Sequence, residues 1–285
     1  MVQVAILEHH LGKNLQLLSV SLKSINDFTL QWFVRAWRTI HFVALILTLA
    51  LSPASYRGDN RVPMAKQIVA GTGQNLLWFT VLCALVSLVL IRIVVVTALS
   101  YGLSKLALEM VVRVLVLELI PLTAAVFVAL RCTLPDGMEL AEMRMHGELD
   151  KLQRLGIDPI QREALPRVMA GIFSVLLLVA VSCVTSLVLA YLTIYGFSPW
   201  GFAGFTRVVG QVFSPAVSII LTFKTLFFSL AVSLIPMASS LYETAQTSLV
   251  PQHGRSKAAL ELSGMVRLFS VILLIEVASL LVNYY

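Results

Sequence analysis

The chain has 285 residues, of which 58% are hydrophobic and only 13% are charged. Soluble domains carry about 25% charged residues, so the charged residues are too few to cover a water-facing surface of this size. The formal charge of +6 does not indicate a nucleic-acid partner, because basic and aromatic residues do not interleave on a soluble face. The composition therefore indicates a polytopic membrane protein.

Residues 1–76 are expected to form a helical region at the membrane surface. Apolar residues recur every three or four positions from Val4 to Ile25, and aromatic residues and arginines follow up to Arg38. This pattern is typical of a helix that lies in the headgroup plane. The apolar run 40–53 is shorter than the ~20 residues of a spanning helix, which favours an interfacial or re-entrant segment. A soluble helical hairpin packed on a partner is the alternative.

Five later stretches are long enough to cross the membrane. Backbone groups in lipid must pair within their own segment, and no β-barrel alternation is present, so the crossings are expected to be helices. The sequence thus predicts an all-α polytopic membrane protein with an interfacial amino-terminal region. The predicted spans are 77–100, 106–131, 168–194, 213–241 and 263–283.

Basic residues give the expected orientation of these spans. The side that holds the second-to-third and fourth-to-fifth connections carries nine lysines and arginines, whereas the other side carries Lys105 and Arg207. Because basic loops stay in the cytoplasm, the amino terminus is expected inside and the carboxyl terminus outside. The nine are Arg131, Arg144, Lys151, Arg154, Arg162, Arg167, Arg255, Lys257 and Arg267.

The connection between the second and third spans predicts an amphipathic cytoplasmic helix over 138–155. Asp136 and Glu139 have the spacing of a capping box, and Gly156 stands where a left-handed helix end favours glycine. The helix either caps the bundle at the headgroups or couples the spans to a cytoplasmic motor, and periodicity favours neither. Its apolar stripe comprises Met138, Ala141, Met145, Leu149, Leu152 and Leu155.

Ionisable residues inside the predicted spans are expected to face the bundle interior or a wet cavity, because each costs about 2.5–3.5 kcal/mol at a helix centre. Glu109 and Arg113 are i, i+4 partners, and Arg92 is expected to join them in an ion-pair network that holds spans together. The six residues are Arg92, Glu109, Arg113, Glu118, Lys224 and Glu276.

Glu118 is different from the other acids because Pro121 follows it by one turn. Proline cannot donate to the carbonyl of Leu117, so the helix should bend and expose a free acceptor there. A carboxylate beside such a bend suits a cavity wall that meets a polar headgroup. The alternative is an intramembrane salt bridge between Glu118 and Lys224.

No catalytic or metal-binding residue is predicted. The segment Gly71 to Gln74 lacks the lysine of a phosphate-binding loop, and the three cysteines have no CxxC spacing. If ATP drives this protein, another chain binds it together with Mg²⁺.

Motifs with fixed spacing resemble those of the MlaE (YrbE) family, the permease subunits of bacterial ABC transporters that work with MCE-domain proteins. The resemblance covers 77–283, which we treat as a permease domain. The matched family segments are E-L-G-P, A-E-L-G-x-M-R-V-T-E-Q-I-D-A-L, G-V-D-P and P-R-x-x-A. The matching residues are Glu118, Leu119 and Pro121, then Glu139, Leu140, Met143, Arg144, Asp150 and Leu152, then Gly156, Asp158 and Pro159, and finally Pro166, Arg167 and Ala170.

The resemblance implies an ATP-driven transporter that moves phospholipid or a similar lipid from or to the bacterial inner membrane and serves outer-membrane lipid asymmetry. It implies a second copy or a paralogue, a cytoplasmic ABC ATPase that holds ATP and Mg²⁺, and an MCE-domain periplasmic protein as partners. Glu118, Pro121 and Lys224 would line the substrate cavity. Glu276 matches a family acid and is expected, with Arg92, Glu109 and Arg113, to belong to the intramembrane ion pairs. The residues that would couple to the ATPase are Glu139, Met143, Arg144, Asp150, Leu152 and Gly156.

The chain departs from the family pattern at Leu117, Ile120 and Gly147. Two other functions compete with this one. The chain could be an ion- or proton-coupled carrier of a hydrophobic substrate that uses Glu118 and Glu276 as proton sites, or a membrane scaffold that transports nothing.

Overall fold

The computed structural model describes residues 34, 37–52, 61–102, 104–247 and 257–284. The chain forms two compact units, Met1–Leu45 and Ile46–Tyr285, and each is described by itself. The periodic pattern predicted over residues 1–33 lies outside the described residues. A helix covers Trp37–Leu51, which is shorter than a membrane crossing requires.

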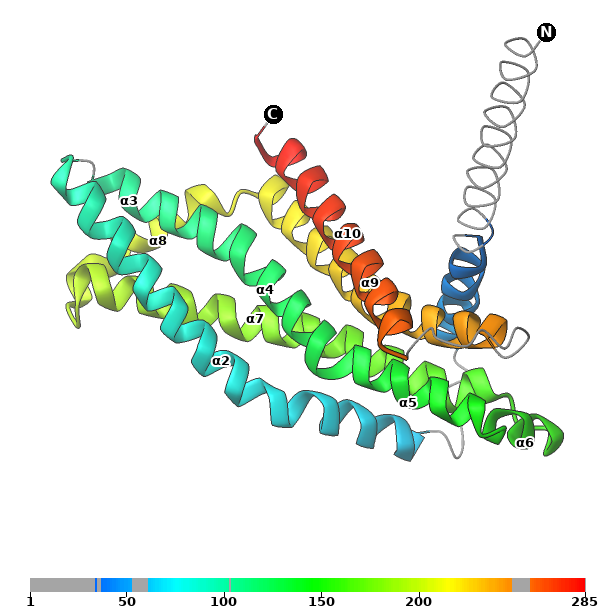
Figure 1. Ribbon diagram of the computed structural model, residues 1–285. Coiled ribbons are helices and arrows are strands. Elements are labelled where there is room, and N and C mark those ends of the chain that lie inside the picture. Colours follow the sequence, from blue (N-terminus) through cyan, green and yellow to red (C-terminus); the bar gives the residue numbers. More distant parts are fainter. Residues whose placement is uncertain (1–33, 35–36, 53–60, 103, 248–256, 285) are drawn as a thin grey trace, which may run out of the picture. The chain divides into compact units, whose positions relative to one another are not determined.

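The described residues of the second unit form helices joined by short turns, with no strand among them, which confirms the all-α fold class (Figure 1). Five helical stretches in the described residues are long and apolar enough to cross a membrane, namely Met64–Ala98, Leu108–Met145, Ile160–Tyr195, Pro215–Leu241 and Gly264–Asn283. The α-helices are α2 (Arg61–Ser100), α3 (Ser104–Val111), α4 (Ile120–Val128), α5 (Leu134–Met145), α6 (Glu148–Arg154), α7 (Leu165–Tyr195), α8 (Phe202–Val212), α9 (Pro215–Thr247) and α10 (Lys257–Tyr284). The shorter elements are the π-helices η3 (Val112–Leu119), η4 (Ala129–Thr133) and η5 (Ile160–Ala164) and the 3-10 turn η6 (Pro199–Gly201).

The first two crossings are longer than predicted. The α2 helix begins at Arg61, well before residue 77, and the second crossing continues through residue 131 to Met145. The predicted capping box at Asp136 was wrong because Thr133 is already helical, with φ −74° and ψ −30°. Pro135 stands in the first turn of α5, directly after the π-helical segment η4, and has no N–H to donate to that preceding turn.

The single cytoplasmic helix predicted over 138–155 is divided into α5 and α6. Gly147 lies between them with φ 70°, and its N–H donates to the Arg144 carbonyl at 3.0 Å. Glycine enters this left-handed region at little cost. Gly147, one of the three positions that depart from the family pattern, therefore ends α5. The predicted end at Gly156 is correct, because the N–H of Ile157 donates to the Leu152 carbonyl at 3.1 Å, the long bond of a Schellman motif.

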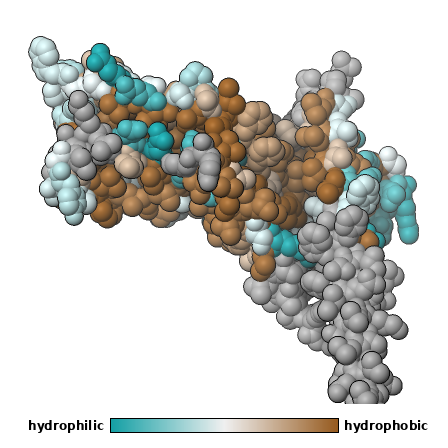
Figure 2. Space-filling view, turned by 90° about the horizontal axis from the view of Figure 1, so that it is seen from above, coloured by the Kyte–Doolittle hydropathy of each residue, from teal (hydrophilic) through white to brown (hydrophobic). Residues whose placement is uncertain are grey.

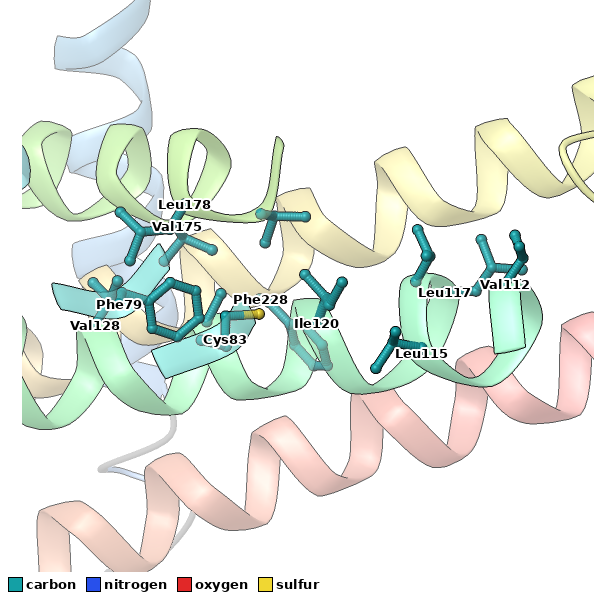
Figure 3. Packing of buried hydrophobic residues seen from close by; sticks show 14 of the residues in the cluster. Phe79, Cys83, Val112, Leu115, Leu117, Ile120, Val128, Val175, Leu178 and Phe228 are labelled. Carbon is teal, nitrogen blue, oxygen red and sulfur yellow. The ribbon is translucent and has the colours of Figure 1, made fainter. Parts of the chain in front are cut away.

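The second crossing is the centre of the bundle. Its most apolar window is 61% buried within the chain, against 28% for α2 and 22% for α10. Figure 3 shows that its side chains meet others from α2, α7 and α9 in one apolar core. The core includes Phe79 of α2, Ile120 of α4, Leu178 of α7 and Phe228 of α9, each at most 1% exposed.

Two hydroxyl pairs join α2 to α7 inside this apolar surrounding. Thr72 Oγ1 lies 2.7 Å from Ser174 Oγ, and Ser87 Oγ lies 2.8 Å from Ser186 Oγ. Interhelical hydrogen bonds of this kind contribute about 0.6 kcal/mol each in membrane proteins. They fix the register of the two helices.

Large apolar side chains remain exposed along the outer faces of the crossings, and Figure 2 shows them over most of the face that it presents. On α2, Leu77 is 76% exposed and Trp78 is 72% exposed. Water would disfavour so much continuous apolar surface, so these faces meet acyl chains or another protein chain. The exposed apolar residues of α2 also include Val69, Val81, Leu82, Leu85, Val86, Leu88, Val89, Ile93 and Val96.

Candidate functional site

Pro121 lies in the first turn of α4, directly after the π-helical segment η3. It has no N–H to donate toward the preceding turn, which holds the carbonyls of Val116 and Leu117. Both carbonyls have side-chain donors from other helices: Lys224 Nζ donates to Leu117 O at 3.2 Å, and Cys183 Sγ lies 3.9 Å from Val116 O. The free acceptor that the proline implied is therefore present, and it receives a lysine from α9.

Lys224 stands between two carboxylates. Its Nζ forms ion pairs with Glu118 Oε2 from η3 and with Glu276 Oε2 from α10, the latter at 2.9 Å. Asn283 Nδ2 also donates to Glu118 Oε1 at 3.3 Å. Lys224 is 3% exposed, Glu118 9% and Glu276 8%. We call Glu118, Lys224 and Glu276 the lysine cluster.

The sequence offered a Glu118–Lys224 salt bridge as an alternative to a cavity wall, and the structure forms this bridge. The sequence did not predict that Glu276 pairs with the same lysine. The helix α10 is far from η3 in the sequence, and residue spacing does not reveal which helices touch. The one indication in the sequence was general: charged residues within a membrane need partners, so Glu276 was expected to have one.

The cluster carries an excess of negative charge when all three groups are ionised, with two carboxylates against one ammonium. The Leu117 carbonyl oxygen adds a further partial negative charge facing Lys224. The Phe228 ring, whose centroid is 5.8 Å from Nζ, covers the lysine on another side. Such a group can exchange one of its carboxylates for another anion without leaving the lysine unpaired.

The other predicted ion-pair network is only partly assembled. Arg113 Nη2 lies 3.4 Å from Glu109 Oε1, and both side chains are partly exposed. Arg92 is exposed and has no ion-pair partner within 4.0 Å in the described part of the chain. The expected link from Arg92 to Glu109 is therefore absent within one chain.

Three of the six residues matched to ATPase coupling, Glu139, Met143 and Arg144, contact other helices of the same chain. Arg167, which is 7% exposed, lies 3.2 Å from Glu139 and 3.8 Å from the Met143 sulfur, and Arg144 donates to the Leu241 carbonyl at the end of the α9 crossing. These contacts fasten α5 to α7 and α9. The matched motif did not reveal which way these side chains point, and their role toward an ATPase stays a prediction.

The remaining three residues lie in or after α6. Asp150 is exposed, Leu152 is half-buried, and Gly156 ends the helix. The predicted apolar stripe is split, since Leu149 is buried while Met138 and Met145 are 46% and 54% exposed. Leu155 is 73% exposed. An apolar surface with a nearby carboxylate therefore stays uncovered on α5 and α6.

The family model described as Permease MlaE matches residues 64–281, a range that contains the lysine cluster and the helices α5 and α6. A search of curated proteins found no match. The match covers well over half of the chain, so the chain belongs to the MlaE permease family and is a membrane permease subunit of a lipid ABC transporter.

Proposed function

We propose that this chain moves phospholipid, or a similar amphipathic lipid, between the bacterial inner membrane and an MCE-domain periplasmic partner. A separate cytoplasmic ABC ATPase binds ATP and Mg²⁺ and drives the movement. A second copy of the chain, or a paralogue, completes the path, and the amino terminus lies in the cytoplasm. Family membership supports the general role, and the lysine cluster supports the lipid path.

The lysine cluster carries the proposal because it joins three crossings by charge inside a membrane. Ionic groups at such positions mark substrate pathways. The phosphate of a lipid headgroup is an anion that can replace Glu118 or Glu276 on Lys224. A headgroup entering the cluster would thus loosen η3 or α10 from α9 and open the path that it follows.

The π-helical segment η3 gives this region a means to move. The eight residues Val112–Leu119 have the wider π spacing immediately before Pro121, and π segments occur frequently at functional sites. A change between π and α spacing rotates the residues on one side of it relative to the other. In this mechanism the change moves Glu118 toward or away from Lys224.

Replacing Glu118 by Gln tests the transport role. The variant leaves Lys224 paired with Glu276 as a neutral pair, so we expect the complex to assemble. ATP-driven lipid transfer between vesicles, measured with the ATPase and MCE partners present, should fall by about tenfold or more, because an ion-pair contact of 1.5–3 kcal/mol is lost from the cycle.

The matched control is Glu109→Gln, which alters a partly exposed carboxylate in the same crossing. It should transfer lipid at the wild-type rate. Unchanged transfer by the Glu118 variant would make that residue structural and would remove the cluster from the path.

The ATPase is proposed to bind the exposed surface of α5 and α6. The double variant Met145→Asp, Leu155→Asp places charges in its apolar part, and we expect at least about tenfold less ATPase to co-purify with the chain. Removing two exposed apolar side chains from a protein interface costs about 1–2 kcal/mol each. Co-purification followed by quantitative gel analysis measures this.

Phe197→Asp is the control for this experiment, because Phe197 is 94% exposed but lies beyond the opposite end of α7. It should leave ATPase recovery unchanged. Full recovery of the ATPase with the double variant would place its contact elsewhere on the chain.

A proton-coupled carrier is the second candidate, and one observation favours it: two carboxylates share a single lysine, an arrangement that can hold an exchangeable proton. The two functions separate cleanly in vesicles that contain the purified chain alone. Lipid movement driven by a pH gradient, without ATP or ATPase, would support the carrier. Movement only with ATPase and ATP would support the transporter.

A further inference from the structure

A polar cavity of about 210 Å³ lies among α2, the η4–α5 junction and α7, away from the lysine cluster. A single water needs only about 10–15 Å³ of such space, so the cavity has room for a larger polar group. The polar side chains that line it are Gln67, Asn75, Arg131, Cys132, Asp136 and Ser174.

The cavity lies at the end of the crossings that carries most of the lysines and arginines. Arg131 stands where the sequence predicts the second span to leave the hydrocarbon, and Ala170 and Ser174 belong to the first turns of the third predicted span. Trp78 of α2, one turn beyond Asn75, is 72% exposed, and tryptophan is enriched at membrane interfaces. These positions put the cavity at headgroup depth in the cytoplasmic leaflet.

Asn75, Cys132 and Ser174, three of the neutral polar groups of the cavity, already have partners. Asn75 Nδ2 donates to Gly71 O at 2.8 Å and lies 3.1 Å from Cys132 Sγ. Ser174 Oγ is paired with Thr72 at 2.7 Å. These groups form a fixed wall and do not require a ligand.

The two charged groups of the cavity have no such partners. Neither Asp136 nor Arg131 has a hydrogen-bond or ion-pair partner among the described residues. Arg167 interacts electrostatically with Asp136, but it is already paired with Glu139 and Glu163. The cavity thus presents one half-buried carboxylate and one exposed guanidinium, and neither is in a direct ion pair with another described residue.

We propose that this cavity binds the headgroup of a zwitterionic phospholipid from the cytoplasmic leaflet. The lipid phosphate lies against Arg131 and the headgroup ammonium against Asp136. Guanidinium groups match phosphate geometry well, and basic pockets between crossings on the cytoplasmic side bind the phosphates of lipid headgroups. Ala70 lines the cavity, and its neighbour Val69 is 70% exposed, which gives the acyl chains an apolar face of α2 to follow.

This site does not depend on the proposed transport path. It shares no residue with the lysine cluster, and a lipid can be held here whether or not lipid is the cargo. Failure of the site would therefore leave the transport proposal intact, and the reverse also holds.

Native mass spectrometry of the full-length chain in detergent tests the proposal, with dihexanoyl phosphatidylethanolamine as the probe. We expect Asp136→Asn and Arg131→Gln each to weaken its binding by about tenfold, as for the loss of one charged hydrogen bond. The matched controls Glu142→Gln on α5 and Arg92→Gln on α2 alter exposed charges outside the cavity and should bind as the wild type does.

Two further probes distinguish the ligand's source and charge. Dihexanoyl phosphatidylglycerol has the phosphate but no ammonium, so Asp136→Asn should not weaken its binding. Free phosphoethanolamine should bind much more weakly than the lipid. Ala70→Trp, which fills the cavity without changing charge, should also reduce lipid binding.

Wild-type affinity for phosphatidylethanolamine in Asp136→Asn would overturn the assignment of the ammonium. Equal affinity for free phosphoethanolamine and for the lipid would overturn the membrane as the source. Equal melting temperatures of variant and wild-type protein are the check that each variant has folded.

Discussion

Replacing Lys224 by Met should prevent most of the protein from reaching its folded state. The variant leaves Glu118 and Glu276 facing each other in a buried site with no cation, while the Leu117 carbonyl loses its donor. Breaking a buried ion pair by removing one partner costs about 3–5 kcal/mol, a large part of the stability of an ordinary domain. The measurement is the yield of monodisperse protein by size-exclusion chromatography, followed by its melting temperature.

Charge balance, more than the lysine itself, should govern this loss. The triple variant Lys224→Met, Glu118→Gln, Glu276→Gln removes all three charges, and we expect it to recover most of the folded yield without recovering lipid transfer. Lys66→Met, a change at an exposed lysine of α2, is the matched control and should be neutral. A Lys224→Met protein that matches the wild type in yield and melting temperature would show that the three groups are not ionised together.

The contrast between Lys224→Met and Glu118→Gln follows from counting charges. Removing one of two carboxylates leaves a neutral pair, whereas removing the only cation leaves two like charges in a low-dielectric site. The two changes should therefore have different effects. Replacing Glu118 should impair transport alone, whereas replacing Lys224 should impair both folding and transport.

Much of the membrane architecture could be predicted from the sequence because it depends on local properties. Apolar length gave the five crossings, and the missing N–H of Pro121 gave the free carbonyl at Leu117. Gly156 ended α6 as predicted because a left-handed helix end is a local event. None of these depends on which helices become neighbours.

What the sequence did not predict depended on which parts of the chain become neighbours. Asp136 resembled a helix start, but the chain before it is already helical because the second crossing continues into α5. The sequence did not reveal that Arg144 donates to the α9 backbone, and its role toward an ATPase stays a prediction. Glu276 was expected in an intramembrane ion pair, but the spacing of α9 and α10 does not show that Lys224 is its partner.

Gly147 shows how one departure from a family pattern acts physically. The family has a glutamate there, which favours a continuing helix, whereas this chain has a glycine with φ 70° and open space around it. The result is a break between α5 and α6 that changes the direction of the chain. The surface proposed for the ATPase is therefore shaped in this protein by two glycines, Gly147 and Gly156.

Replacing Gly171 by Leu should have the second large effect. A Cβ at this position of α7 would lie 2.5 Å from Ser233 Oγ and 2.9 Å from Thr133 Cγ2. Ser233 and Thr133 are fully buried, so α7, α9 and η4 have no room to separate without losing their contacts. Overpacking of a well-packed core costs about 1–3 kcal/mol for a few methylene groups, and a leucine adds four carbons where the first already overlaps. We expect folded yield to fall severalfold or more and the melting temperature to fall in what remains.

Gly73→Leu is the matched control, because Gly73 is also a helical glycine, in α2, and an added Cβ there meets nothing within 4 Å. It should fold like the wild type. Gly171→Ala should show an intermediate loss, since the Ser233 hydroxyl can rotate away but the Thr133 methyl group remains, and adding Thr133→Ser should restore part of it. The two changes share one contact, so their effects on melting temperature should not add. Additive effects, or a Gly171→Leu protein as stable as Gly73→Leu, would mean that α7 does not pass this closely between α9 and η4.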